Sequence, residues 1–265
     1  MRVRQPAVAG RFYEADPSRL RESIRRLLAE AAPAGPGRAE GLIVPHAGYA
    51  YSAPIAASGH AWLIPRAAEI DRVILLGTCH TAGVSGLAAS SDDSFETPLG
   101  EVPVDRGAVA RALEQEGAAV RDDAHARDHS LEVQLPFLQV VLDRFRIVPF
   151  LVGAASPAEV AGVLDAFWNE PGTIVVVSSD LSHYHDYEEA RRLDAATARA
   201  IEGLEEEALG PGSACGRHAI AGLLRSARGR GLTCRTVDLR SSGDTAGRRD
   251  RVVGYGAFVM LAGSL

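Results

Sequence analysis

Metal-ligand and acid/base side chains follow one strongly apolar stretch of the chain. The β-branched run 173–177 leads directly into Asp180, His183 and His185. A short, continuously apolar run is typical of an interior strand of an α/β sheet, and ligand crevices in such sheets lie beyond the carboxyl ends of the strands. These side chains therefore stand where a functional site is expected.

Two more histidines occupy the same kind of position. His46 comes two residues after a predicted strand at 41–44, and His80 follows a predicted strand at 72–76. A single histidine in a loop is usually structural or simply exposed. Parallel neighbouring strands, however, bring their carboxyl ends side by side. We therefore expect His46 and His80 to face one crevice.

A helical pattern beginning near residue 131 adds a further histidine. It places His129 at the first turn, where the imidazole can face a site with Glu132 on the same side. A capping role for Ser130 is the simpler alternative. The sequence supports both interpretations equally.

Cys215 precedes another helical segment. The unpaired N–H groups and the dipole at a helix N-terminus lower a thiol pKa and favour the thiolate. Cys79 and Cys234 are interpreted instead as small buried side chains. Three scattered cysteines do not form a disulfide framework, which indicates a reducing compartment.

The candidate residues share ligand-type side chains at strand or helix ends: His46, His80, His129, Glu132, Asp180, His183, His185 and Cys215. Two neutral imidazoles and one anionic ligand with open positions describe a non-haem iron(II) site. A thiolate as the anionic ligand favours softer metals, so copper(I) and zinc remain alternatives. A Ser/His/Asp hydrolase is less well supported, because Gly-x-Ser-x-Gly does not occur and triad partners usually come from distant segments.

The elements that must position these residues alternate along the chain. Strands are predicted at 41–44, 72–76, 146–152, 173–177, 233–239 and 252–261. Helices are predicted after N-caps at Asp16, Ser52, Asp105, Ser156 and Asp186, the last with Glu189 completing a capping box. Residues 86–104 favour a hairpin excursion and 6–13 a packed surface arm. We expect one α/β domain over 1–265, with a mostly parallel or mixed central sheet flanked by helices.

Composition narrows the function classes. The chain has 265 residues, 46% of them hydrophobic, and a formal net charge of -6. Nucleic-acid binding is not expected, because binding to backbone phosphates requires a concentrated basic patch. No apolar run approaches the roughly 18 residues of a membrane span, and no signal-peptide pattern opens the chain. We expect a cytoplasmic protein without membrane association.

Taken together, these motifs resemble the Memo family, of the type named AmmeMemoRadiSam system protein B. That family is related to the class III, LigB-type extradiol dioxygenases. The resemblance covers essentially the whole chain and rests on the motifs at 6–13, 45–52, 77–80, 128–132, 178–184 and 215–218. The motifs Pro45-His46-Ala47-Gly48-Tyr49-Ala50-Tyr51-Ser52 and Ser178-Ser179-Asp180-Leu181-Ser182-His183-Tyr184 are the most specific.

The resemblance implies a LigB-dioxygenase-like fold and a set of site residues. It assigns the metal ligands to His46, His80 and Cys215, places Asp180 and His183 beside them, and has His129 lining the same pocket. In the related dioxygenases the third iron ligand is a glutamate, whereas the matching position here is Cys215. A thiolate changes both the charge that the iron receives and the ease with which the site is oxidised.

Three functions follow as hypotheses. The first is redox or dioxygenase-related activity with iron(II), or copper, in which His183 acts as general acid/base, Asp180 orients it and His129 assists. The second is a module that uses the histidine-lined crevice to hold a phosphorylated or carboxylated ligand, a small molecule or a peptide, without turnover, as implied by phosphopeptide binding in animal relatives. The third and weakest is a zinc hydrolase. For prokaryotic members the resemblance also implies a functional link to a radical-SAM protein.

Overall fold

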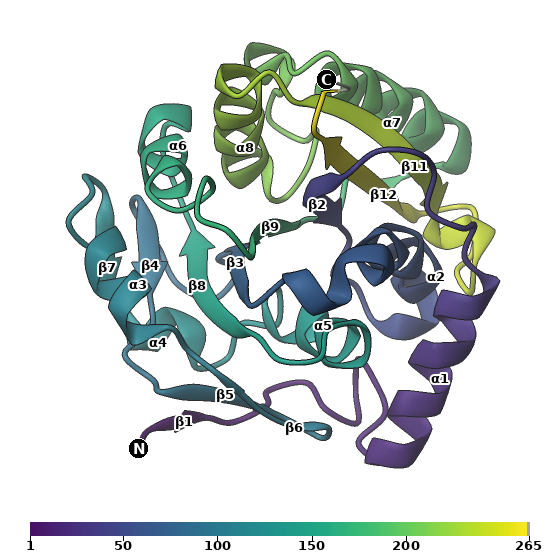
Figure 1. The fold of residues 1–265 in the computed structure, drawn as a ribbon. Coiled ribbons are helices and arrows are strands. Elements are labelled where there is room, and N and C mark those ends of the chain that lie inside the picture. Colours follow the sequence, from purple (N-terminus) through teal and green to yellow (C-terminus); the bar gives the residue numbers. More distant parts are fainter. Residues whose placement is uncertain (264–265) are drawn as a thin grey trace.

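The computed structural model describes residues 1–263, and a nine-stranded mixed sheet forms its centre (Figure 1). The strands follow one another across the sheet in the order β10 (His183–His185), β12 (Val252–Leu261), β2 (Ala39–Val44), β9 (Thr173–Ser178), β3 (Arg72–Thr78), β8 (Arg146–Val152), β4 (Leu87–Ala89) and β7 (Ala118–Val120). In addition, β11 (Thr233–Ser241) pairs with β12. The four strands from β2 to β8 are parallel, whereas β12 and β4 run antiparallel to them. The α/β prediction with a mixed central sheet is confirmed.

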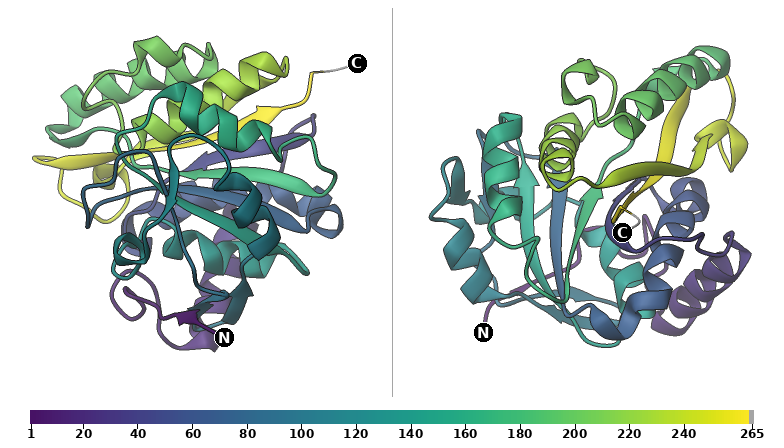
Figure 2. Two further views of the ribbon diagram at one scale, coloured as in Figure 1. Left: turned by 90° about the vertical axis from the view of Figure 1, so that its left-hand side faces the viewer. Right: turned by 45° about the horizontal axis from the view of Figure 1, so that its top comes forward.

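Helices cover both faces of this sheet (Figures 1 and 2). One face carries α6 (Pro157–Asp165), α7 (Tyr187–Glu202) and α8 (Arg217–Gly229), and the other carries α1 (Pro17–Glu30), α2 (Tyr49–His60) and α5 (Leu135–Val141). Because the parallel strands are covered on both sides, their side chains are apolar on both, and Ile74, Val148 and Val176 are completely buried.

Shorter elements complete the described chain. A separate three-stranded sheet joins β1 (Val3–Arg4), β5 (Ser94–Thr97) and β6 (Gly100–Pro103). The short helices are η1 (Ala61–Glu69), α3 (Arg106–Ala112), α4 (Asp122–His125), η2 (Glu132–Gln134), η3 (Glu206–Ala208) and η4 (Ser242–Asp244). The predicted hairpin at 86–104 is therefore formed only by β5 and β6, and β4 belongs to the main sheet.

The strand register brings three loops to one edge of the sheet. Val44 at the end of β2 pairs with Ser178 at the end of β9, and Gly77 in β3 pairs with the same Ser178. The segments that follow these strands consequently leave the sheet side by side, as the parallel arrangement predicted.

Most predicted helix starts are confirmed. Asp16, Asp105 and Asp186 each accept backbone N–H groups as N-caps, and Ser156 forms a capping box. The predicted start at Ser52 is wrong: α2 begins three residues earlier, with Tyr49. The carbonyl of Phe12, in the N-terminal arm, accepts the Tyr49 N–H at 2.7 Å, so no side-chain cap is needed there.

The long α7 differs from the prediction in one detail. Its cap at Asp186 is present, but the Glu189 side chain does not return to the backbone to complete a capping box. Instead, a Glu189 carboxylate oxygen lies 3.1 Å from Nδ1 of His185.

Within residues 1–263, none of the helices is both long enough and apolar enough to cross a membrane.

Candidate metal centre

Three side chains of metal-ligand type converge at the carboxyl edge of the sheet. His46 follows β2, His80 follows β3, and Cys215 immediately precedes Gly216, the N-cap of α8. One ligand atom from each lies within 4.8 Å of the others, and Nε2 of His46 is 3.3 Å from Sγ of Cys215. Tetrahedral bonds of about 2.0–2.3 Å to nitrogen and sulfur place ligand atoms roughly 3.5 Å apart, so the three residues fit a single ion.

A hydrogen-bond chain sets the tautomer of His46. The Ser178 hydroxyl donates its only proton to the Ser130 carbonyl at 2.6 Å and accepts an N–H from Gln134 at 2.8 Å. Nδ1 of His46, 3.1 Å from the same hydroxyl, must therefore carry the hydrogen. The ring is thereby oriented with Nε2 toward Cys215. Burial opposes protonation of His46, but Cys215 and Asp180 outweigh it and raise the pKa of His46 to about 9, so without a cation Nε2–H faces the thiolate. A bound metal would take the place of that proton.

The same chain continues to a second buried histidine. The Gln134 amide donates to the Pro45 carbonyl and to Ser178, so its Oε1 is the acceptor that Nε2–H of His60 reaches at 3.0 Å. His60 is completely buried, and its Nδ1 finds no partner among the described residues. Burial lowers the pKa of His60 to about 4, although the bond to Gln134 acts in the opposite direction.

Replacing His60 with glutamine should make the fold less sensitive to acid. Because the folded pKa of about 4 lies below the ordinary 6.5, stability is intact above pH 6.5 and is lost as the pH falls toward 4. The loss amounts to about 2 kcal/mol at about pH 5. His60→Gln keeps an N–H for Gln134 but does not titrate. Urea unfolding at about pH 7.5 and about pH 5 should show a smaller difference in the variant, and equal differences would contradict this role.

His80 is held by a buried carboxylate. Asp128 accepts the His80 backbone N–H at 2.7 Å, and the same oxygen lies 3.5 Å from the ring Nδ1. Burial opposes ionisation of Asp128, but its hydrogen bonds from His80 and Ser130 hold its pKa well below the ordinary value. A carboxylate behind a ligating histidine is the usual means of fixing ring orientation at metal sites.

Cys215 is partly buried and electrostatically activated. Its Sγ accepts the Asp180 backbone N–H at 3.3 Å. Burial raises the thiol pKa. Neighbouring His46 and His80 together outweigh this effect and lower the pKa to about 5 when no cation is bound. The following Gly216 cannot be replaced without a shift, because a Cβ there would lie 2.7 Å from the Cβ of Ser179. The cysteine is therefore positioned as a thiolate, the form that binds metals.

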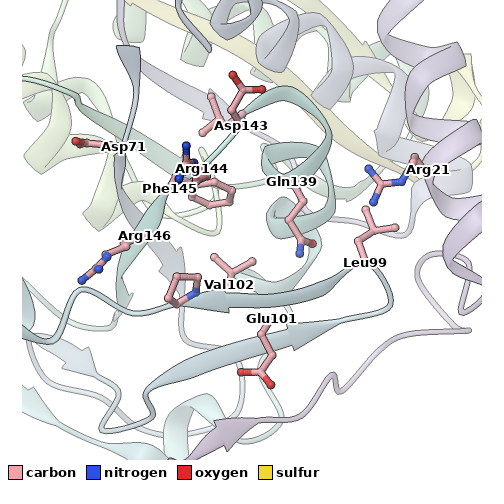
Figure 3. Close-up of a pocket in the computed structure, with 12 residues that line it drawn as sticks. Arg21, Asp71, Leu99, Glu101, Val102, Gln139, Asp143, Arg144, Phe145 and Arg146 are labelled. Atoms are coloured by element: carbon pink, nitrogen blue, oxygen red, sulfur yellow. The ribbon is translucent and has the colours of Figure 1, made fainter. Parts of the chain in front are cut away.

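A cavity of about 840 Å³ opens above this cluster. Five of the eight candidate residues line it, namely His46, His80, His129, Asp180 and His183. A second cavity, of about 580 Å³, lies at the opposite edge of the sheet, where β8 begins at Arg146 (Figure 3). No histidine or cysteine is among the residues lining that second cavity, so the predicted chemistry belongs to the first.

Two histidines of the cavity retain a free nitrogen for proton transfer. Nδ1 of His183 lies 2.8 Å from the Leu181 carbonyl and must donate to it, which leaves Nε2 as the acceptor. Burial, followed by repulsion from His46 and His80, lowers the pKa of His129 to about 4. Its ring stacks on that of His80 at 4.8 Å. His129 is thus neutral at neutral pH.

Several details differ from the sequence interpretation. A carboxylate oxygen of Asp180 accepts the backbone N–H of His46 at 2.8 Å, and it is the Leu181 carbonyl that orients His183. Glu132 does not share the cavity with His129, because it binds the N-terminal arm. His185 turns instead to Glu189.

Ser130 has no capping role. Its hydroxyl contacts the Thr78 carbonyl and the Asp128 carboxylate, and η2 has no side-chain cap. Sequence reasoning also missed the supporting roles of Asp128, Gln134 and Ser178. In the sequence, the only indication of these roles was that each residue is polar and lies within or beside a candidate motif.

The fold and the cluster together define an α/β protein with a His/His/Cys set of metal-ligand type at the carboxyl edge of its sheet. The chain belongs to the Memo-like family, whose sequence model matches residues 4–259. This confirms the resemblance drawn from the motifs.

Relatives of similar length support the assignment. A MEMO1 family protein of Aeropyrum pernix is 39% identical, with 97% of this chain and 99% of the relative covered. MEMO1 family proteins of Aquifex aeolicus and Thermotoga maritima are 36% and 35% identical; the alignments cover 98% and 95% of this chain and 100% and 97% of the relatives.

Proposed function

We propose that the chain is a metal-dependent redox protein that binds iron(II) through His46, His80 and Cys215 and acts on a small molecule in the cavity above them. The carrying observation is the His46–Ser178 hydrogen bond, which directs Nε2 of His46 toward the Cys215 sulfur 3.3 Å away, where a metal ion would replace the proton between them. Two imidazoles and one anion leave positions open for substrate, as in non-haem iron sites related to the extradiol dioxygenases. A bound iron(II) ion would supply Lewis acidity and a one-electron redox couple.

The residues around the metal ligands can transfer protons and exclude water. Nε2 of His183 can accept a proton from a hydroxyl of the substrate, because its other nitrogen is occupied by the Leu181 carbonyl. His129 is a neutral imidazole beside both metal-type histidines and can form a hydrogen bond with the substrate. Phe12 packs on the ring of His129 at 4.8 Å and excludes water from that side.

Zinc is the competing occupant. Cysteine and histidine are the ligands of many zinc sites, and three protein ligands with an open fourth position are typical of catalytic zinc. The orientation of His46 and the thiolate of Cys215 serve zinc as well as iron. In that case the cavity would carry out hydrolysis, with His183 as the general base.

Elemental analysis distinguishes these functions. Protein purified anaerobically with reductant should contain about one iron per chain and should consume oxygen with a suitable catechol. Copper in place of iron would keep the redox function with a different metal. Zinc alone, retained after iron is offered in excess, would support hydrolysis, and absence of any transition metal would refute the metal-based proposal.

Replacing Asp128 with asparagine should weaken metal binding without unfolding the protein. Asparagine keeps the shape and one acceptor oxygen, but it removes the charge behind His80. Loss of such a partner typically lowers metal affinity roughly 10–100-fold. Competition with a chelator of known affinity measures the change, and Asp123→Asn, on an exposed carboxylate paired with Arg121, is the matched control. Unchanged affinity in Asp128→Asn would exclude a role in holding His80.

A further inference from the structure

Tyr184 has an unusual backbone conformation at the mouth of the metal cavity. Its φ of 67° lies in the left-handed region, which a bulky side chain rarely adopts because of steric repulsion. The β10–β12 register shifts between His183 and His185, so Tyr184 is the extra residue of a bulge. Bulges beside active sites redirect side chains, and here Tyr184 is 62% exposed and lines the cavity.

Helix termination does not explain this conformation. Among the described non-glycine residues, Leu204 is the other with a positive φ, of 53°. Leu204 directly follows Gly203, the C-cap of α7, and the next N–H, of Glu205, bonds back to the Ala200 carbonyl at 2.9 Å. That is ordinary helix termination. Tyr184 follows no helix, and strain of this kind is characteristic of functional sites.

Buried groups hold the strained segment in place. Asp194, on α7 and only 3% exposed, accepts the Ser182 N–H at 3.0 Å. The Gly254 backbone bonds to both Leu181 and Ser182 at 2.8 Å. Position 254 must be glycine, because a Cβ there would lie 1.9 Å from the Asp194 carboxylate. The conformation of Tyr184 is therefore imposed by the surrounding fold.

Two arginines at the same mouth have no carboxylate partner. The guanidinium of Arg251 lies over the Tyr184 ring at 4.4 Å from its centroid. Neither Arg251 nor Arg11 forms an ion pair within residues 1–263, whereas Arg248, which lines the same cavity, is paired with Asp250 at 3.2 Å. Stacking on an aromatic ring orients a guanidinium and leaves its N–H groups free for an anion.

We propose that Tyr184, Arg251 and Arg11 form a specificity site for a small planar organic acid. Its carboxylate or phosphate binds the two guanidinium groups, its planar body lies along Tyr184, and its uncharged end points toward His46. The cavity volume of about 840 Å³ suits a small molecule. This inference deepens the proposed function, on which it rests for the chemistry at the cavity floor.

Calorimetric titration tests the site with benzoate and phenyl phosphate as probes, and with benzamide as the uncharged analogue of benzoate. Wild type should bind at least one of the anions and should bind benzamide at least about 10-fold more weakly, as expected when a charge-assisted hydrogen bond is lost. If benzoate alone binds, the acid group is a carboxylate, and if phenyl phosphate alone binds, it is a phosphate. Equal binding of benzamide, or binding only to a longer phosphopeptide, would overturn the proposal.

Matched variants distinguish a specific binding site from a general attraction of anions to positive charge. Arg251→Gln should weaken binding of the anion about 10-fold or more, whereas Arg248→Gln, which removes the arginine already paired with Asp250, should change it by less than about 3-fold. Tyr184→Gly should weaken binding while raising the midpoint temperature of unfolding, because glycine adopts a positive φ without strain. Equal losses in both arginine variants would overturn the proposal, as would unchanged binding in Tyr184→Gly.

The titrations are carried out with and without added iron, so that the two proposals can fail separately. Binding of the anion by protein that takes up no metal would refute the metal-based function and leave this site intact. Normal uptake of iron with no binding of either anion would refute this site alone.

Discussion

Cys215→Ala should abolish tight metal binding. Cys215 supplies the only thiolate of the cluster, and without it two imidazoles remain with no anionic ligand to balance the charge of the ion. Metal affinity should fall by more than the roughly 10–100-fold that follows loss of a supporting hydrogen bond. Iron content after anaerobic reconstitution and desalting measures the effect, with about one iron per chain expected in wild type and almost none in the variant.

The other two cysteines provide matched controls. Cys79, one residue before His80, donates its thiol to the Ala82 carbonyl, and burial raises the thiol pKa of Cys234, on β11, to about 12. Their alanine variants should retain iron. A circular dichroism spectrum of Cys215→Ala that matches wild type would show that metal is lost without unfolding. Normal iron content in that variant would place the metal elsewhere.

The position of the cluster could be predicted because it follows from local patterns. Apolar runs identified the parallel strands. The segments that follow parallel strands leave the sheet at the same edge, and His46 and His80 lie in two such segments. Cys215 comes from a helix start on a separate segment. Its place in the cluster was implied by the family resemblance and is not a consequence of strand pattern alone.

The supporting contacts could not be predicted, because they join residues far apart in sequence. Glu132 was expected to face the cavity on the basis of α-helical spacing, but residues 132–134 form a 3₁₀ turn, in which side chains follow one another at about three residues per turn. The direction of Glu132 is decided by Arg4, 128 positions away. The bulge at Tyr184 likewise depends on Asp194 and Gly254, and no local pattern reports it.

Glu132→Gln should cause a large loss of stability for a single substitution. Glu132 is fully buried and accepts hydrogen bonds from Arg4 at 2.5 Å, from the Ala7 and Val8 N–H groups at 2.7 and 3.0 Å, and from the Tyr13 hydroxyl at 2.7 Å. In the variant, an amide NH₂ group takes the place of one carboxylate oxygen, so a hydrogen-bond donor faces other donors. The buried Arg4 also loses its counter-charge. Breaking a buried ion pair in this way costs about 3–5 kcal/mol.

The loss should be concentrated in the N-terminal arm, because Glu132 is the point at which residues 4–13 are fastened to the domain. Urea unfolding measures the total change, and trypsin cleavage after Arg11 under native conditions should become faster as the arm detaches. Glu30→Gln, which breaks the exposed Arg26–Glu30 pair, is the control and should leave both measurements unchanged. The arm also carries Phe12 to His129, so its release should open the metal cavity to water. Wild-type stability and wild-type cleavage in Glu132→Gln would show that packing alone holds the arm.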